Sequence, residues 1–469
     1  MDLWPRIYVS TPLLYLTHAV PYYVLGDQTW AYGPLKAAYL CFGIYAAARF
    51  FGLFVEPRRA WIGSLLLMLT PLHDGATLWF AGQYLTISLG LYLLAYVQAH
   101  AGRPVLAVVL ALCGSFSSYG SAPIAAGLAL IFMLQKRWPQ AVWMLGPNVL
   151  YATYYWYTSA ILGMGTARLP AELDAATLAV SFAAQFATFI DAGVGPSAWL
   201  KYALGLSSLT WMSAVVALAA GVWIWHGTRE ASTSDTPVTG HHVLLAGCGA
   251  IALAAFGVFA LTGAYPQVAF SLGNRVAIFG NLFVAAAAMS WLRPKMLAAL
   301  GVLTVAAFLG ISDHWRTWNG ILEASRADVR RLELPVDPDT PVFVRGLQYS
   351  SLGRVAHIDH FTATYVVRDF FALARGGATL RPASFNARLR IEDTALVDIK
   401  YGVRTPVGEA IVLYDAERRT LMRIPRPEIE DRLGEERIEL RHWTQLLGPG
   451  LIRDLIVRVM PHLRYAYGG

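Results

Sequence analysis

The sequence predicts a polytopic α-helical membrane bundle followed by a smaller soluble α/β domain. The first observation is composition: 56% of the residues are hydrophobic and only 14% are charged, whereas soluble globular proteins carry about 25% charged residues. The second is the distribution of charge. Residues 1–312 hold 14 Lys/Arg and 9 Asp/Glu, and residues 313–469 hold 23 Lys/Arg and 21 Asp/Glu. We therefore expect a transmembrane domain over 1–312 and a soluble domain over 313–469.

The apolar part contains about ten candidate membrane spans, several of them shorter than the roughly 20 residues that a straight span requires. Residues 9–25 are also apolar, but His18, Pro21 and two tyrosines make them more typical of a helix at the membrane interface. The ten predicted spans are 31–53, 59–73, 84–100, 104–119, 121–135, 138–162, 199–226, 242–262, 276–292 and 295–312.

Basic residues are concentrated in every second predicted loop. These residues are Arg58, Arg59, Arg103, Lys136, Arg137, Arg229, Arg293 and Lys295. The alternate loops carry only Arg168 and Arg275 as basic residues. Because cytoplasmic loops are enriched in Lys and Arg, the first set is predicted to be cytoplasmic. The N-terminus and residues 313–469 are then extracytoplasmic.

Two further features exclude classes of function. The three cysteines, Cys41, Cys113 and Cys248, all lie inside apolar runs, which excludes a disulfide framework and a CxxC metal site. The net charge of +7 is not arranged as a basic stripe with interleaved aromatic residues, so a nucleic-acid partner is not expected.

Four motifs follow one another at the predicted outer ends of the spans. They are PLL, THA, YY, LG and WAY within 12–32, TPLHDGATLWFAGQ at 70–83, SSYGSAP at 117–123, and NRV at 274–276. In this order they resemble motifs of the GT-C superfamily of membrane glycosyltransferases. The resemblance is closest to the branch that contains the transmembrane and TPR-repeat O-mannosyltransferases and their bacterial relatives. It covers about residues 1–310 and is strongest over 10–95.

The resemblance implies a multi-pass protein of the bacterial inner (cytoplasmic) membrane with an extracytoplasmic C-terminal domain. Its expected activity is transfer of a sugar from a polyprenyl-phosphate donor to a cell-envelope glycan or protein. Such a hexosyl transfer needs a carboxylate base for the acceptor hydroxyl, and cations or a divalent metal for the developing lipid phosphate. The sequence identifies no cofactor.

The chemical positions of the family are less well matched than its scaffold. The family places a helix and a loop with a catalytic acid before the first motif, whereas only Asp2 precedes it here, so an upstream helix is expected to be missing from this sequence. The glutamate that follows the family's second motif falls at Gly75, and the family's arginine falls at Gln83. An acid and a base of the third motif fall at Ser118 and Gly120.

Four residues are the candidates for a site. His73 and Asp74 are the catalytic candidates; they either position phosphate or metal, or form a polar loop end. Arg275 is the candidate for lipid-phosphate binding, because arginine suits phosphate geometry, although it could instead snorkel towards headgroups. Lys36 has the same two alternatives.

Other polar groups in the apolar part have a structural alternative to a site role. Asp27 is expected in a turn. Glu172, Asp174 and Asp191 belong to the outer segment 163–198, in which 171–190 is predicted to be an interfacial helix. The aromatic run from Tyr151 to Tyr157 is typical of an interfacial belt, with a sugar-stacking wall as the alternative.

In the soluble domain, 341–345 and 410–414 are predicted strands and 361–375 a predicted helix. The charged stretch 426–441 is expected on a solvated surface, and 451–464 as an amphipathic basic helix. A separate set of residues, His357, Asp359 and His360, is close enough in sequence for metal ligation.

Three functions are consistent with these features to different degrees. The first is a glycosyltransferase of GT-C type. The second is a catalytically silent relative that serves as a membrane subunit or scaffold in envelope polysaccharide assembly. The third, a transporter, is disfavoured because the sequence shows no charge buried in mid-span and no inverted repeat, and because the outer domain is large.

Overall fold

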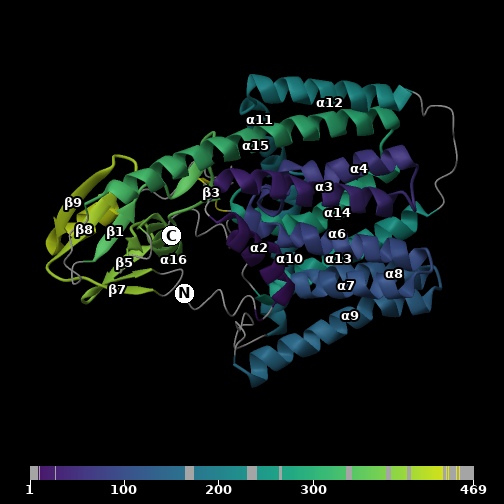
Figure 1. Ribbon diagram of the computed structural model, residues 1–469, viewed down its shortest axis with the longest axis horizontal. Helices are drawn as coiled ribbons and strands as arrows, with labels where there is room; N and C mark the ends of the chain where they lie inside the picture. Colours follow the sequence, from purple (N-terminus) through teal and green to yellow (C-terminus); the bar gives the residue numbers. More distant parts are fainter. Residues whose placement is uncertain are drawn as a thin grey trace. The chain divides into compact units, whose positions relative to one another are not determined.

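We describe a computed structural model of the chain (Figure 1). The structure describes residues 9, 11–26, 28–163, 174–229, 240–262, 267–333, 341–375, 382–398, 403–436, 440, 442, 450, 451 and 454. The chain divides into two compact units, Met1–Asp313 and His314–Gly469.

In its described residues, the first unit consists of helices and the turns between them. Several begin with proline in the first turn, where the missing N–H costs nothing and the fixed φ angle suits a helix. The long helices are α2 (Pro12–Leu25), α3 (Tyr32–Phe51), α4 (Pro57–Leu69), α6 (Tyr84–His100), α7 (Pro104–Ser117), α8 (Ser121–Leu134), α9 (Trp138–Trp156), α10 (Ala175–Gly193), α11 (Pro196–Ser207), α12 (Trp211–Arg229), α13 (His241–Thr262), α14 (Ile278–Trp291) and α15 (Pro294–Arg331).

Five stretches of the described chain are long and apolar enough to cross a membrane: Phe80–His100, Ala175–Ser207, His241–Thr262, Leu272–Trp291 and Pro294–Arg331. Shorter apolar helices lie at Pro104–Ser117, Ser121–Leu134 and Trp211–His226. The structure thus supports a helical membrane unit.

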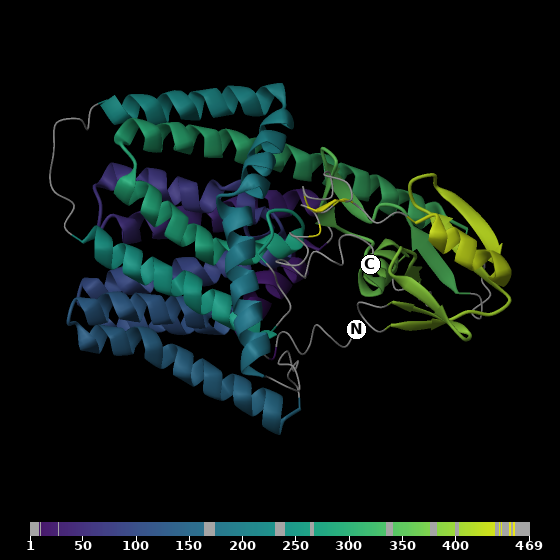
Figure 2. The same cartoon turned by 180° about the vertical axis from the view of Figure 1, so that it is seen from behind.

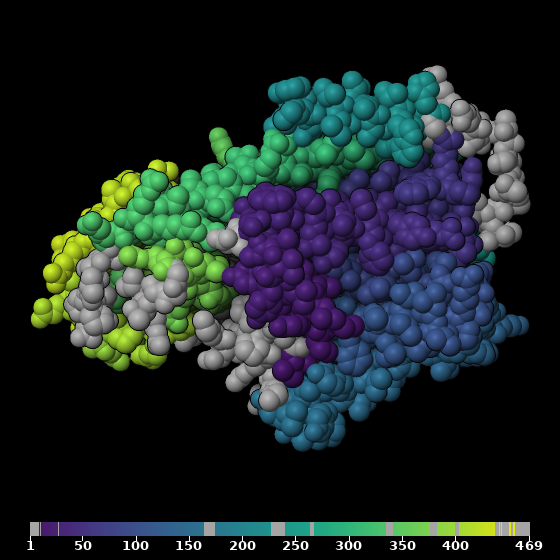
Figure 3. Space-filling view, in the orientation of Figure 1, coloured from purple at the N-terminus to yellow at the C-terminus, as the bar shows by residue number. Residues whose placement is uncertain are grey.

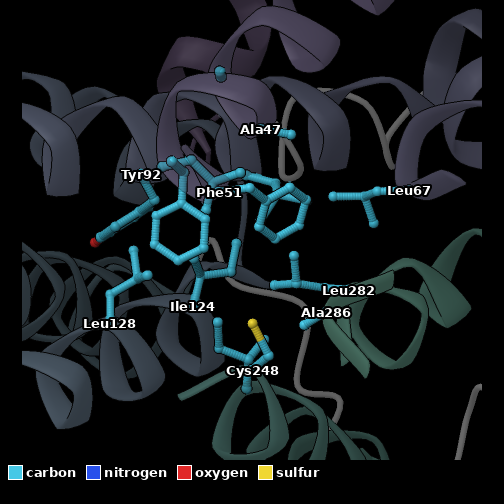
Figure 4. Close-up of a cluster of buried hydrophobic side chains, with 14 of the residues drawn as sticks. Ala47, Phe51, Leu67, Tyr92, Ile124, Leu128, Cys248, Leu282 and Ala286 are labelled. Atoms are coloured by element: carbon cyan, nitrogen blue, oxygen red, sulfur yellow. The ribbon is translucent and has the colours of Figure 1, made fainter. Parts of the chain in front are cut away.

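The core of this unit is apolar and closely packed. Figure 4 shows Phe51, Leu67, Tyr92 and Cys248 converging from four different helices. At one crossing, α8 and α13 approach so closely that a Cβ placed on Gly127 would lie 2.5 Å from the carbonyl oxygen of Gly247. Small residues at such crossings let helix backbones pack directly against each other in an apolar solvent.

The turns of the helical unit gather in two groups. In the first group, Arg137 donates to the carbonyl of His100 (3.1 Å) and Arg59 to that of Leu292 (3.2 Å). These contacts join the turns that were predicted to be cytoplasmic. In the second group, the segments around 71–83 and 272–278 lie together. The helices therefore carry their basic turns and their motif segments at opposite ends.

The predicted span 199–226 is wrong. It contains two helices, α11 and α12, separated at residues 208–210. Figure 2 shows α10 and α11 lying crosswise to long helices such as α13, whereas α12 runs along them. Gly205 and Gly310 explain the close crossing of α11 and α15, because a Cβ on Gly310 would lie 1.8 Å from the carbonyl oxygen of Gly205.

The last predicted span, 295–312, forms the first part of a longer helix. Helix α15 continues without interruption to Arg331. Residues 313–331 contain no proline and only one glycine, so no residue in this stretch stops the helix. The side chains change from apolar to charged, which changes the solvent that suits this part of the helix but leaves its backbone helical.

In its described residues, the second unit contains three small sheets, the helices α16 and α17, and the end of α15. The largest sheet has the order β4-β1-β8-β9, in which β1 pairs in parallel with both β4 and β8, and β9 pairs antiparallel with β8. The predicted strands and helix of this unit correspond to β1, β8 and α16. The elements are β1 (Val342–Arg345), β2 (Tyr349–Leu352), β3 (Val355–Asp359), α16 (Thr364–Arg375), β4 (Ala383–Ser384), β5 (Leu389–Glu392), β6 (Ala395–Asp398), β7 (Arg404–Pro406), β8 (Ala410–Asp415), β9 (Thr420–Pro425) and α17 (Ile429–Gly434).

Both faces of the largest sheet are buried. Val342 and Val344 of β1 join one apolar cluster with Phe371 of α16, and Phe343 joins a second cluster with Ile411. Successive side chains of a strand point to opposite faces, so the continuous apolar run in β1 serves both clusters. This is the pattern expected of a strand inside an α/β layer.

Candidate functional site

The second motif forms three short helical turns instead of a span end. These are η2 (Pro71–His73), α5 (Asp74–Thr77) and η3 (Phe80–Gly82). The turns stack tightly, because a Cβ on Gly82 would lie only 2.0 Å from the carbonyl oxygen of Gly75. A Cβ on Gly75 would lie 2.6 Å from Oδ1 of Asn274. A side chain such as the family's glutamate therefore has no room at position 75.

The four motifs meet in this region. His18 donates from Nε2 to the carbonyl of Phe80 (2.9 Å), which joins the first motif to the second. The backbone N–H of Gly75 donates to Asn274 Oδ1 (2.9 Å), which joins the second to the fourth. Gly120 of the third motif lies against Leu85, two residues after the end of the second motif. Segments up to 200 residues apart are thus assembled into one polar region.

Asp74 forms the centre of this polar region, which we call the Asp74 cluster (Asp74, Lys201 and Asn274). Lys201 Nζ lies 2.6 Å from Asp74 Oδ1, and both side chains are fully buried. Asn274 Nδ2 donates to the same oxygen at 2.5 Å, and Lys201 also donates to the carbonyl of Ala269. A buried carboxylate requires this kind of charge and hydrogen-bond compensation.

His73 points to a different neighbour from the one that Asp74 contacts. Asn281 of α14 donates from Nδ2 to His73 Nδ1 (2.8 Å), and the His73 side chain is fully buried. His73 has a non-helical backbone (φ −135°, ψ 36°) between two short helical turns, and it and the adjacent Asp74 bind different polar side chains. Asn281, the partner of His73, and Asn274, one of the two partners of Asp74, both lie on the segment 274–281.

Arg275 lies on the second motif instead of extending away from it. Its guanidinium carbon is 5.4 Å from the ring centroid of Trp79, and Nη1 donates to the carbonyl of Leu272 (2.8 Å). It is half-buried. This stacking places the cation beside the motif, while its neighbour Asn274 is the residue that contacts Asp74.

Lys36 reaches the same segment from α3. Its Nζ donates to the carbonyl of Leu78 (3.4 Å), and the side chain is half-buried. Gln83, in the position of the family's arginine, donates to the carbonyls of Thr77 (2.7 Å) and Lys36 (3.3 Å). Two candidate phosphate ligands, Lys36 and Arg275, therefore contact the adjacent residues 78 and 79.

The acids of the outer segment have structural roles. Asp174 caps α10 by accepting from the backbone N–H groups of Ala176 (2.8 Å) and Thr177 (3.0 Å). Asp191 accepts from the backbone N–H of Ser197 (3.2 Å) at the start of α11. Asp27 and Glu172 lie outside the described residues.

Part of the aromatic run 151–157 is used in packing, whereas Trp156 and Tyr157 are exposed. Tyr151 and Tyr154 each lie 5.4 Å from Phe116 between ring centroids. Tyr154 also donates to the carbonyl of Val9 (2.7 Å).

In the second unit, His360 lies among aromatic rings. Its ring centroid is 4.1 Å from Phe361 and 5.3 Å from Phe370. This burial lowers the pKa of His360 to about 4. Within the described ranges no three His, Cys, Asp or Glu side chains are grouped so that they could hold a metal ion. Of the predicted amphipathic helix 451–464, nearly all residues lie outside those ranges.

Sequence reasoning missed Lys201. It stands alone as a cation in the otherwise apolar α11 (PSAWLKYALGLS), and an isolated charge in such a segment is by itself a sign of a buried partner. The pair of Lys201 and Asp74 lies in the motif region at one end of the helices, so it does not test the prediction that no charge is buried in mid-span.

Comparisons of the chain with protein-family models, with curated proteins and with solved structures gave no significant match.

Proposed function

We propose that this chain is a membrane glycosyltransferase of GT-C type that transfers a hexose from a polyprenyl-phosphate donor to an extracytoplasmic glycan or protein. The observation that carries the proposal is the assembly of all four motif segments into one region at one end of the helical unit. Contacts such as Gly75 to Asn274 (2.9 Å) join positions about 200 residues apart.

Within this proposal, Arg275 and Lys36 bind the lipid phosphate. Both are half-buried cations in contact with residues 78 and 79. A guanidinium offers several N–H donors in a plane that matches phosphate oxygens, and an ammonium adds a point charge. His73 and Asp74 precede this segment in the chain. Their hydrogen bonds with Asn281 and Asn274 hold the segment against 274–281.

The same proposal sets the topology at about ten spans, in the inner membrane of a bacterium. The basic turns lie at the end opposite the motifs, as the contacts of Arg137 with His100 and of Arg59 with Leu292 indicate. A cytoplasmic location of these turns puts the motif region at the outer leaflet and the second unit outside the cytoplasm. A reporter active only in the cytoplasm, fused after residue 330, should be inactive; an active reporter would reject this orientation.

A specific observation favours a second candidate, the catalytically silent subunit. Asp74 is fully buried and bound by both Lys201 (2.6 Å) and Asn274 (2.5 Å). A carboxylate compensated in this way cannot take a proton from an acceptor hydroxyl without first losing Lys201. A catalytic base would then have to come from another residue or another chain.

Substitution of Arg275 tests the proposed phosphate site. Membranes containing the full chain and a polyprenyl-phosphate hexose are assayed for transfer of labelled sugar. Arg275→Ala should reduce transfer about tenfold or more, because charge-assisted hydrogen bonds of roughly 1.5–3 kcal/mol are lost. Arg275→Lys should retain part of the activity, because a point charge replaces the planar guanidinium.

Arg293→Ala is the matched control, since Arg293 is an exposed cation in the turn between α14 and α15. Transfer that is equal in Arg275→Ala and Arg293→Ala would remove Arg275 from the site. Absence of transfer by the unaltered chain, with the donor present and the protein folded, would favour the silent subunit.

A further inference from the structure

A cleft of about 930 Å³ opens between α4 and α12 in the helical unit. Its size lies within the range of about 300–1,000 Å³ that is typical of ligand pockets. Two tryptophans stand at its sides, Trp61 with 46% of its surface exposed and Trp223 with 68%. The lining residues are Pro57, Arg58, Trp61, Ile62, Leu65, Ala219, Val222, Trp223, Ile224 and His226.

The floor of the cleft is formed where both helices rest on α15. A Cβ on Gly301 of α15 would lie 3.0 Å from Ile62 of α4 and 3.9 Å from Ile224 of α12. Gly221 of α12 similarly lies against Val302, with 3.1 Å to its Cγ1. In Figure 3, α12 is the teal ridge at the upper edge, and α15 (green) lies between it and the purple N-terminal helices.

The polar lining is confined to one end of this apolar cleft. Arg58 stands in the first turn of α4 and His226 near the last described side chains of α12. The neighbouring Arg59 points elsewhere and donates to the carbonyls of Met289 (2.5 Å) and Leu292 (3.2 Å). Arg58 is half-buried, and no ion pair to an acidic side chain is formed by it within the described part of the chain.

We propose that this cleft binds an anionic membrane lipid, with its phosphate at Arg58 and its acyl chain over Ile62 and Ile224. The positive charge of Arg58 is complementary to a phosphodiester. The apolar walls of the cleft extend away from Arg58 along α4 and α12. Arg58 belongs to the end of the unit that carries the basic turns, which is the end expected at the headgroups of the cytoplasmic leaflet. Tryptophan at that level is typical of the membrane interface.

The proposed lipid site is separate from the proposed glycosyl-transfer region. It lies at the opposite end of the helices, and the proposal that a lipid binds there does not require that the protein transfers a sugar. A free phosphate would bind Arg58 but leave the apolar walls unused, and a helix from a second copy of the chain would use the walls but offer no anion to Arg58. The membrane lipid satisfies both parts of the cleft.

The experiment is native mass spectrometry of the full chain in detergent, titrated with phosphatidylglycerol and, separately, with phosphatidylcholine. The unaltered chain should retain one phosphatidylglycerol more tightly than phosphatidylcholine. Arg58→Ala should weaken phosphatidylglycerol binding about tenfold, whereas Arg293→Ala should not change it. Inorganic phosphate at millimolar concentration should not displace the lipid.

A second pair of variants tests the apolar walls. Ala219→Trp fills the cleft from α12, whereas Leu218→Trp places the same tryptophan side chain at the preceding residue, which is 69% exposed and does not line the cleft. Only Ala219→Trp should abolish retention, with both variants melting at the temperature of the unaltered chain. If Ala219→Trp melts lower, Val222→Trp replaces it.

Three results would overturn the proposal. They are equal retention of phosphatidylglycerol by the Arg58→Ala and Arg293→Ala variants, equal affinity of the unaltered chain for both lipids, and a dimer that Ala219→Trp converts to monomer without a change in lipid binding. The last result would identify a second copy as the occupant of the cleft.

Discussion

Lys201 and Arg58 are two basic residues at opposite ends of the helical unit, and their surroundings differ. Lys201 is fully buried and lies 2.6 Å from Asp74, with Asn274 on the same carboxylate oxygen. Arg58 is half-buried at the mouth of an apolar cleft. The enclosed cation has its counter-charge within the fold, whereas the open one can take its counter-charge from a ligand. The charge of a residue alone therefore does not identify a binding site. The burial of its side chain and the partners that it already contacts within the fold must also be known.

Arg58 and Arg59 repeat this contrast between adjacent residues. Arg59 crosses to the end of α14 and donates to the carbonyls of Met289 and Leu292, which lack partners within their own helix end. Arg58 lines the cleft. The rotation of about 100° between consecutive residues of an α-helix gives one arginine a structural contact and the other an open environment.

The largest expected effect comes from breaking the Asp74 cluster. Lys201→Met leaves the Asp74 carboxylate buried without its cation, which should lower the free energy of unfolding by about 3–5 kcal/mol. The measurement is unfolding of the purified chain in mixed micelles, followed by tryptophan fluorescence. The double variant Asp74→Asn with Lys201→Met should recover most of the loss, because no charge is then left unpaired. A double variant as unstable as Lys201→Met would mean that packing, not charge, causes the effect.

A smaller effect should separate the two adjacent arginines. Arg59→Ala removes hydrogen bonds to two carbonyl groups and should cost about 1–3 kcal/mol of unfolding free energy. Arg58→Ala should change stability by less than about 0.5 kcal/mol, although it should weaken lipid binding. Both variants are compared in lipid-free detergent, so that any bound lipid does not contribute. Equal destabilisation by the two substitutions would show that Arg58 is also a structural residue.

The smallest effect concerns His360 and pH. Burial among aromatic rings lowers the pKa of His360 to about 4, below the value of about 6.5 in an unfolded chain. The unfolded state therefore binds a proton between pH 6.5 and 4 that the folded state does not, and stability falls as the pH decreases through this window. His360→Phe keeps the aromatic contacts and should reduce by a few degrees the fall in melting temperature between pH 7.5 and 4.5. An unchanged fall in His360→Phe would assign the pH dependence to other groups.

Much of the local structure could be predicted from the sequence. The turns between successive apolar helices, such as 101–103 and 136–137, were predicted because glycine, proline and charge interrupt long apolar runs. The strands β1 and β8 and helix α16 were predicted from their apolar spacing. The extent of α15 beyond residue 312 was not, because the sequence there changes polarity without any residue that stops a helix.

The candidate site was predicted in part. His73, Asp74, Arg275 and Lys36 do lie on segments that meet, but the partner of Asp74 is Lys201, in a segment that was predicted to be part of a continuous span. The crosswise direction of α11 brings Lys201 to Asp74, and that direction depends on the contact of Gly205 with Gly310.

The sequence by itself determined the division into an apolar helical unit and a charged second unit. Each side chain favours either an apolar or an aqueous environment, and this preference can be judged for each residue from the sequence alone. Only the tertiary structure decided which charges are paired and where a cleft remains open. Both depend on close approaches between residues far apart in the chain, such as Asp74 with Lys201 and Gly301 with Ile62, and such distances are set by packing and not by local composition.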